Sequence, residues 1–197
     1  MRVAGIGFAK QASIHRKVAF IKESRITVMK LYIKQKVFSI KRRSSIYDAA
    51  GNEAYYSEAI IPSIGTKLKI YDRSGAELIY IEQKFWSFLP KYKIFKDGAE
   101  IAEVVKDFTF FKPKYTINGL GWTVTGDFFD HNYQIMCDDE VIASVHKEWF
   151  TFGDAYELDF SEFVDVPTAL AVVLVIDACL DATGDDSGFS IRIGSNR

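Results

Sequence analysis

The sequence is poor in several residue types, and each shortage excludes a class of protein. Its 197 residues include two cysteines, four prolines and three histidines. One pair of cysteines cannot supply the disulfide framework of a small secreted scaffold, so we expect a reducing, cytoplasmic location. The few prolines form no linker between residues 29 and 165, which favours a single domain.

An excess of charge of one sign is also missing over the chain as a whole. A net charge of −1 argues against binding of nucleic acid through bulk electrostatics. Residues 1–28 are the exception, with six basic residues and one acidic residue, yet they have neither the apolar core nor the cleavage site of a secretory signal. We interpret them as a poorly ordered basic extension. A transit-like peptide or an amphipathic membrane arm is the alternative, and Met29 could be the natural start.

Aromatic residues, by contrast, are abundant: 16 Phe, 10 Tyr and 3 Trp make up 15% of the chain. Large rings suit the half-buried surface of strands, so this bias favours β structure. Several rings recur at strand spacing and could form a platform on which a ligand stacks, but core or cross-strand packing is the interpretation we favour. These rings are Phe85, Trp86, Phe88, Phe108, Phe110, Phe111, Trp149, Phe150 and Phe152.

A repeated motif indicates the architecture more directly. The pattern Ile-Tyr-Asp-x-x-Gly-x-Glu begins at Ile46 and again at Ile70, and related copies begin at Ile94 and Ile135. In each copy an apolar run meets an aspartate followed by turn residues. This is typical of a hairpin, because Asp bonds to its own backbone and Gly accepts a positive φ. Many short strands with close turns indicate a sandwich or a barrel.

The C-terminal part contains one long apolar run. Residues 169–180 are apolar at 11 of 12 positions, the exception being Asp177. The length favours a helix over a strand, at about residues 168–182, and Asp165 with Pro167 provides a helix start. The run is too short to span a bilayer. A helix that is hydrophobic on every face must be surrounded, and in a β-rich chain a curled sheet surrounds it.

Several segments together point to one family. They are residues 34–40, the Ile-Tyr-Asp-x-x-Gly copies, and residues 126–131, 147–150, 153–158 and 175–178. In these segments the chain resembles the LURP-one-related family of the tubby C-terminal-like superfamily, which also includes the phospholipid scramblases. The resemblance implies a mainly β fold, a closed, roughly twelve-stranded antiparallel β-barrel enclosing one C-terminal hydrophobic α-helix.

The resemblance covers about residues 30–183, which places the barrel domain at residues 29–183 and leaves residues 184–197 as a polar tail. Bacterial members of the family look like proteins without an assigned activity, whereas tubby domains bind phosphoinositides and scramblases associate with membranes. Contact with phospholipid is therefore one hypothesis that the resemblance raises. No phosphoinositide-site motif matches this sequence residue by residue, so no such site is carried over.

No constellation of residues demands a particular chemistry. One group of metal-ligand types has a spacing that fits neither a zinc pattern nor a calcium loop, and a turn explains it equally well. The group consists of Asp127, Asp130, His131, Asp138 and Asp139. Nucleotide-loop spacing and a nucleophile elbow are absent, and nothing links either cysteine to a histidine. We therefore expect a protein that is not an enzyme and that carries no cofactor or metal.

Pairs of lysines alternate with apolar residues along three expected strands, so both members of a pair share one face. The pairs are Lys34 and Lys36, Lys67 and Lys69, and Lys91 and Lys93. A solvated outer face explains them, but convergence of several lysines would create a site for anionic lipid head groups. The head-group candidates are Lys34, Lys36, Lys67 and Lys69.

The leading hypothesis is a non-enzymatic cytoplasmic barrel, peripheral at the membrane, that binds an anionic membrane phospholipid or another small anionic or hydrophobic ligand. The alternative is a structural or protein interaction module without lipid affinity. Salt-sensitive binding to anionic vesicles would separate the two. A hydrolase is a remote third option, and no nucleic acid partner is expected.

Overall fold

The computed structural model describes residues 29–34, 43–109, 112–150 and 153–183. These residues form twelve strands and one helix. The strands are β1 (Met29–Lys34), β2 (Arg43–Asp48), β3 (Glu53–Ala59), β4 (Lys67–Asp72), β5 (Glu77–Gln83), β6 (Lys91–Lys96), β7 (Ala99–Lys106), β8 (Tyr115–Asn118), β9 (Trp122–Asp127), β10 (Asn132–Cys137), β11 (Glu140–Phe150) and β12 (Gly153–Phe160), and the helix is α2 (Val166–Thr183). The expected extension at 1–28 and tail at 184–197 lie outside the described residues.

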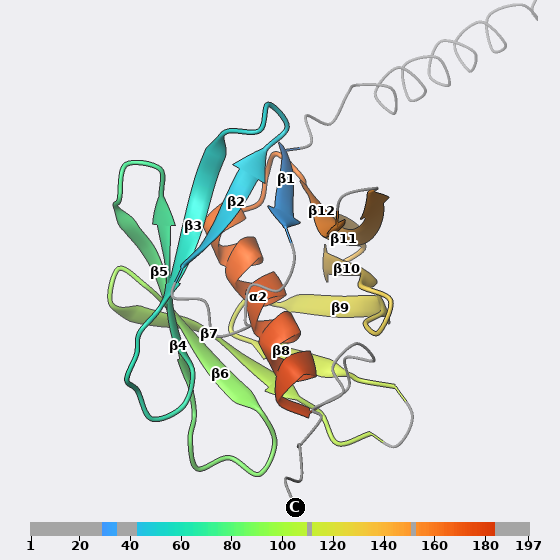
Figure 1. Ribbon diagram of the computed structural model, residues 1–197. Coiled ribbons are helices and arrows are strands. Elements are labelled where there is room, and N and C mark those ends of the chain that lie inside the picture. The colour runs from blue at the N-terminus through green and yellow to red at the C-terminus, as the bar shows by residue number, and fades with distance from the viewer. Residues whose placement is uncertain (1–28, 35–42, 110–111, 151–152, 184–197) are drawn as a thin grey trace, which may run out of the picture.

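All twelve strands belong to one antiparallel sheet, which curls around α2 (Figure 1). The strand order is β8-β7-β6-β5-β4-β3-β2-β1-β12-β11-β10-β9, so the first strand lies between β2 and the last strand. The sheet edges β8 and β9 are consecutive in the chain and contact each other. The barrel is therefore nearly closed, and the predicted fold is confirmed.

Alternation along the strands separates an apolar inner face from a polar outer face. In β4, Leu68 and Ile70 are buried inside, while Lys67 and Lys69 point outward and remain partly exposed. Strand β6 repeats this pattern, with Tyr92 buried at 1% exposure. Side chains two residues apart point the same way on a pleated strand, so the sequence period alone produces the two faces.

The repeated motif forms hairpins, as predicted. In the first turn the Asp48 carboxylate accepts hydrogen bonds from the backbone N–H groups of Ala50 and Asn52, both at 2.9 Å. Asp72 makes the equivalent pair of bonds in the second turn. All four copies also carry the same irregularity, a register shift directly after the isoleucine, at Ile46, Ile70, Ile94 and Ile135. Each copy is thus a hairpin with a bulge at a fixed position.

The helix α2 fills the barrel. Asp165 accepts a hydrogen bond from the backbone N–H of Thr168 at 3.2 Å and another from its hydroxyl, which makes it the N-cap. Residues 169–176 and 178–180 are all buried, and the helix packs on β5, β6 and β7. The expectation that the apolar run is enclosed by strands is confirmed, and the helix is slightly longer than predicted.

Antiparallel connections place the loops after β3, β5 and β7 at one end of the barrel, with the C-terminal end of α2 (the lower end in Figure 1). These loops carry exposed rings: Phe85, Trp86, Phe88 and Phe108. The interpretation of these four as core or cross-strand residues is therefore wrong, because they follow the strands instead of lying within them. Of the other rings in that prediction, Trp149 and Phe150 lie on β11, and Phe110, Phe111 and Phe152 lie outside the described residues.

Candidate functional site

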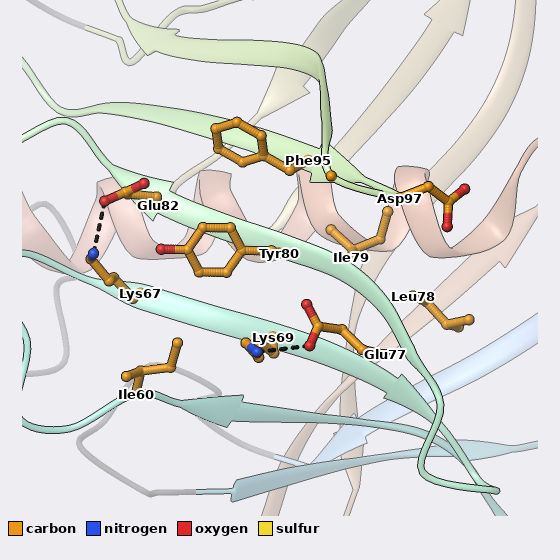
Figure 2. Close-up of a pocket in the computed structure, with 11 residues that line it drawn as sticks. Ile60, Lys67, Lys69, Glu77, Leu78, Ile79, Tyr80, Glu82, Phe95 and Asp97 are labelled. Atoms are coloured by element: carbon orange, nitrogen blue, oxygen red, sulfur yellow. Dashed lines mark hydrogen bonds and ion pairs between the residues drawn. The ribbon is translucent and has the colours of Figure 1, made fainter.

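An open groove of ≈ 660 Å³ lies on the outer face of β4, β5 and β6 (Figure 2). It begins near Ile60, at the end of the barrel that carries the exposed loops, and extends to the β6–β7 turn. Its lining residues are Ile60, Lys67, Lys69, Glu77, Leu78, Ile79, Tyr80, Glu82, Phe95, Asp97 and Gly98. The groove contains two of the four predicted head-group lysines and is the candidate binding site.

The register of the strands sets the polar walls of this groove. Lys67 lies opposite Glu82 across β4 and β5, and their side chains form an ion pair at 2.9 Å. Lys69 lies opposite Tyr80 and reaches diagonally to Glu77 at 2.7 Å. Figure 2 shows both ion pairs on the same side of the sheet. The groove therefore presents ammonium and carboxylate groups next to each other.

The two lysines hold their protons firmly. The hydrogen bond to Glu82 is the main cause of a raised pKa for Lys67, and the bond to Glu77 does the same for Lys69. All four charged side chains are between 31% and 42% exposed, so solvent screens each pair and a ligand can replace either partner. Both signs of charge stay available to a bound molecule.

Aromatic side chains form the apolar part of the groove. Tyr80 and Phe95 are opposite each other on β5 and β6, with ring centroids 5.6 Å apart and planes tilted by 35°. Figure 2 shows the Tyr80 ring between the two ion pairs and the Phe95 ring beside it. An aromatic surface beside carboxylates attracts an ammonium group or an alkyl chain.

The predicted lysines do not all converge. Lys67 and Lys69 share the groove, whereas Lys34 lies on β1, separated from β4 by two strands. Lys36 lies outside the described residues. Both lysines of the third pair form ion pairs, Lys91 with Glu103 at 3.4 Å and Lys93 with Glu100 at 2.7 Å. Two of the four candidates are thus brought together.

Sequence reasoning missed the charged and aromatic residues that line the groove beside the lysines, namely Glu77, Tyr80, Glu82 and Phe95. A signal for one of them was present, since Glu77 is the last residue of the repeated motif and the hairpin carries it back toward the lysine strand. The remaining three needed the register of β5 against its neighbours β4 and β6. The bulge after Ile70 shifts the β4–β5 register by one residue.

Inside the barrel, a cavity of ≈ 10 Å³ lies beside the helix, lined among others by His131, Tyr133, Tyr156 and Asp177. Burial, reinforced by the charge of Asp177, raises the pKa of Tyr133 well above its ordinary value. The His131 ring packs on the Tyr156 ring, with their centroids 4.6 Å apart. This space is at most large enough for one water molecule.

Asp127, a candidate metal ligand in the sequence, has structural partners. Asp127 accepts hydrogen bonds from the backbone N–H groups of Phe129 and Asp130, which makes it a turn residue. Within the described residues no three His, Cys, Asp or Glu side chains gather as metal ligands would. Cys137 and Cys179 both lie in the described ranges and form no disulfide, and burial raises the pKa of Cys179 to about 12. Among the residues that the structure describes, no helix has the length and hydropathy of a membrane span.

The chain is similar to a protein family, a bacterial protein and a solved plant structure. The family model described as LURP-one-related matches residues 29–177. The Bacillus subtilis (strain 168) protein "Uncharacterized protein YxjI" is 38% identical over 162 residues, which is 82% of this chain and 100% of that protein. The X-ray structure of the Arabidopsis thaliana protein AT5G01750 has a similar fold, with a TM-score of 0.58 and 14% identity over 78% of this chain and 91% of that one.

Proposed function

The chain belongs to the LURP-one-related family, and on that premise we propose that it is a non-enzymatic binding protein whose outer groove holds the head group of a membrane phospholipid. The observation that carries this proposal is the pairing of ammonium and carboxylate groups around two aromatic rings. The protein would then act at the membrane surface without crossing it.

The filled interior supports an external site. Barrels that bind small molecules usually hold them in the lumen, but here α2 occupies that space with side chains that are almost fully buried. The groove on β4 to β6 is larger than the internal cavity by a wide margin. A volume of several hundred cubic ångströms is typical of small-ligand sites.

The charges around the groove favour a head group that carries both signs. Two lysines face three carboxylates, those of Glu77, Glu82 and Asp97. A phosphate can bond to Lys67 and Lys69, while an ammonium group bonds to the released glutamates or lies over Tyr80. Phosphatidylserine, an anionic phospholipid, and phosphatidylethanolamine both have a phosphate and an ammonium group.

Titration of the full chain with water-soluble short-chain phospholipids tests this proposal. We expect phosphatidylserine and phosphatidylethanolamine to bind more tightly than phosphatidylglycerol, which lacks an ammonium group. Lys67→Gln and Lys69→Gln should each weaken binding about fivefold, the equivalent of ~1 kcal/mol for one lysine near a phosphate surface. The measurement is the dissociation constant by calorimetry.

Lys30→Gln is the matched control, because Lys30 is also an ion-paired lysine on a strand but belongs to β1 and pairs with Glu157 and Asp159. It should leave binding unchanged. If none of the short-chain phospholipids binds, or if the groove variants bind as tightly as the unaltered chain, the proposal is wrong and the structural or protein interaction module takes its place.

A further inference from the structure

One end of the barrel has an apolar surface that the groove does not explain. Most of the exposed large hydrophobic side chains of the described residues lie in or beside the three loops after β3, β5 and β7, at residues 60–66, 84–90, 107–109 and 112–114. Trp86 is 92% exposed and Phe88 is 98% exposed. Water surrounds these rings, so the folded chain gains little from them.

Hydrogen bonds join the three loops into one continuous rim. The backbone N–H of Gln83 bonds to the carbonyl of Thr66 at 2.8 Å, and the Thr66 N–H bonds back to the Gln83 side chain at 2.9 Å. On the other side, the Lys106 N–H bonds to the carbonyl of Pro90 at 3.0 Å. The protruding side chains are therefore held on a connected framework. They are Ile61, Ile64, Phe85, Trp86, Phe88 and Phe108.

The charge of this rim is positive. The first loop has no charged residue, and the other two hold Lys84, Lys112 and Lys114 against Asp107. Thr116 donates a hydrogen bond to the Asp107 carboxylate. In the residues that the structure describes, none of the three lysines forms an ion pair, in contrast to the paired lysines of the groove.

We propose that this rim is a membrane-docking surface, in which Trp86, Phe88 and Ile64 insert into the interfacial region of an anionic phospholipid bilayer. Trp is enriched at membrane interfaces because its ring suits the head-group level. Lysines beside apolar side chains add attraction to anionic lipids and keep their ammonium groups in water. Rings that project almost fully into solvent suit a fluid surface, which closes around them without a preformed pocket.

The rim also orients the groove, and this part of the inference rests on the proposed function. Lys67 begins β4 and Glu82 lies near the end of β5, so the groove approaches the rim at its Ile60 end. A barrel docked by its rim would place that end at the level of the head groups. The long axis of the groove would then run away from the membrane.

Co-sedimentation of the full chain with phosphatidylcholine vesicles, with and without phosphatidylglycerol, tests the proposal. We expect binding that rises with the anionic lipid and falls with added salt. Trp86→Ser combined with Phe88→Ser should reduce the partition coefficient roughly tenfold or more, because two large rings no longer enter the apolar phase. Both residues are exposed, so the variant should fold as the unaltered chain does.

Phe163→Ser is the matched control, because Phe163 is 81% exposed but follows β12 at the opposite end of the barrel. It should partition as the unaltered chain does. A second measurement uses Trp122→Phe with Trp149→Phe, which leaves Trp86 as the fluorescent residue. Its emission should shift to the blue with anionic vesicles and be quenched by brominated lipids.

Two results would overturn the inference. One is vesicle binding that does not change in the Trp86→Ser and Phe88→Ser variant. The other is a full chain that does not bind anionic vesicles; concentration-dependent self-association that the same variant abolishes would then make the rim a protein interface. Loss of vesicle binding in the rim variant with retained binding of short-chain phospholipid supports the rim. Vesicle binding that depends on the rim, in a chain that does not bind short-chain phospholipids, also supports the rim as a docking surface. The proposed function of the groove would then be wrong.

Discussion

At the scale of single residues, Asp165 connects the sheet to the helix. Its carboxylate caps α2 through the N–H and hydroxyl of Thr168 and also accepts a hydrogen bond from Lys96 at 2.7 Å. Burial opposes ionisation, but the bonds from Lys96 and Thr168 outweigh it and hold the pKa of Asp165 below its usual range. One side chain thus sets where the helix begins and attaches that point to β6.

Replacing Asp165 by alanine should therefore lower the free energy of unfolding by about 1 kcal/mol at neutral pH, the usual effect of losing an N-cap. Because the folded pKa is depressed, this contribution is complete above the unfolded pKa of about 4. It is lost as the pH falls through the lower folded value. Urea denaturation followed by circular dichroism, from neutral to acid pH, measures the difference.

Asp139→Ala, in the exposed turn after β10, is the control for this experiment and should leave the urea midpoint nearly unchanged. A stability gap between Asp165→Ala and the unaltered chain that persists undiminished in acid would show that the charge of Asp165 is unimportant.

At the scale of elements, the hairpins and the helix could be predicted because their causes are local. The Asp48 and Asp72 turns follow from the repeated motif, and the run at 169–180 has no polar face to expose. The pairing of β1 with β12 has no local cause, since the two strands meet from opposite ends of the chain. The apolar run and the family resemblance both predicted a barrel, but neither predicted that these two strands pair within it.

A close approach of strands β9 and β10 depends on Gly126. An added Cβ there would lie 2.5 Å from the carbonyl oxygen of Asn132 and 2.6 Å from the Cα of Tyr133, with φ at +134°. Gly126→Ala should lower the free energy of unfolding by about 3 kcal/mol, through backbone strain and overpacking. Thermal unfolding by calorimetry measures this.

The comparison for that variant is Gly51→Ala, because Gly51 also has a positive φ of +82° but has open space around its Cβ position. Strain alone should cost about 1 kcal/mol there. Equal losses at the two glycines would mean that the contact with β10 does not matter.

At the scale of the whole molecule, the candidate site has some features that the sequence predicts and others that depend on how distant strands pair. That Lys67 and Lys69 share an outward face follows from alternation, and the structure places both in the groove. Their glutamate partners depend on strand register, and the separation of Lys34 from them depends on strand order. Local patterns determine which way a side chain points, while its neighbours depend on pairing between distant segments.

The barrel and its helix should unfold together, because neither can bury its apolar face alone. Leu174 is 1% exposed on α2, and Leu174→Ala should lower the free energy of unfolding by about 3 kcal/mol. The denaturation midpoints from far-ultraviolet circular dichroism and tryptophan fluorescence should shift equally.

Val141→Ala is the control for this experiment, since Val141 is 44% exposed on β11. It should move neither midpoint appreciably. Two separate transitions in the Leu174→Ala protein would contradict the idea of a single cooperative unit.

The position of β1 between β2 and β12 also has a consequence for biosynthesis. A ribosome releases β1 early, yet one of its two neighbours and the helix that fills the lumen are made last. Until then the inner faces of the earlier strands have nothing to cover them, and nascent chains of this kind are prone to aggregate. Synthesis of β12 and α2, more than any early local event, is what allows this barrel to become native.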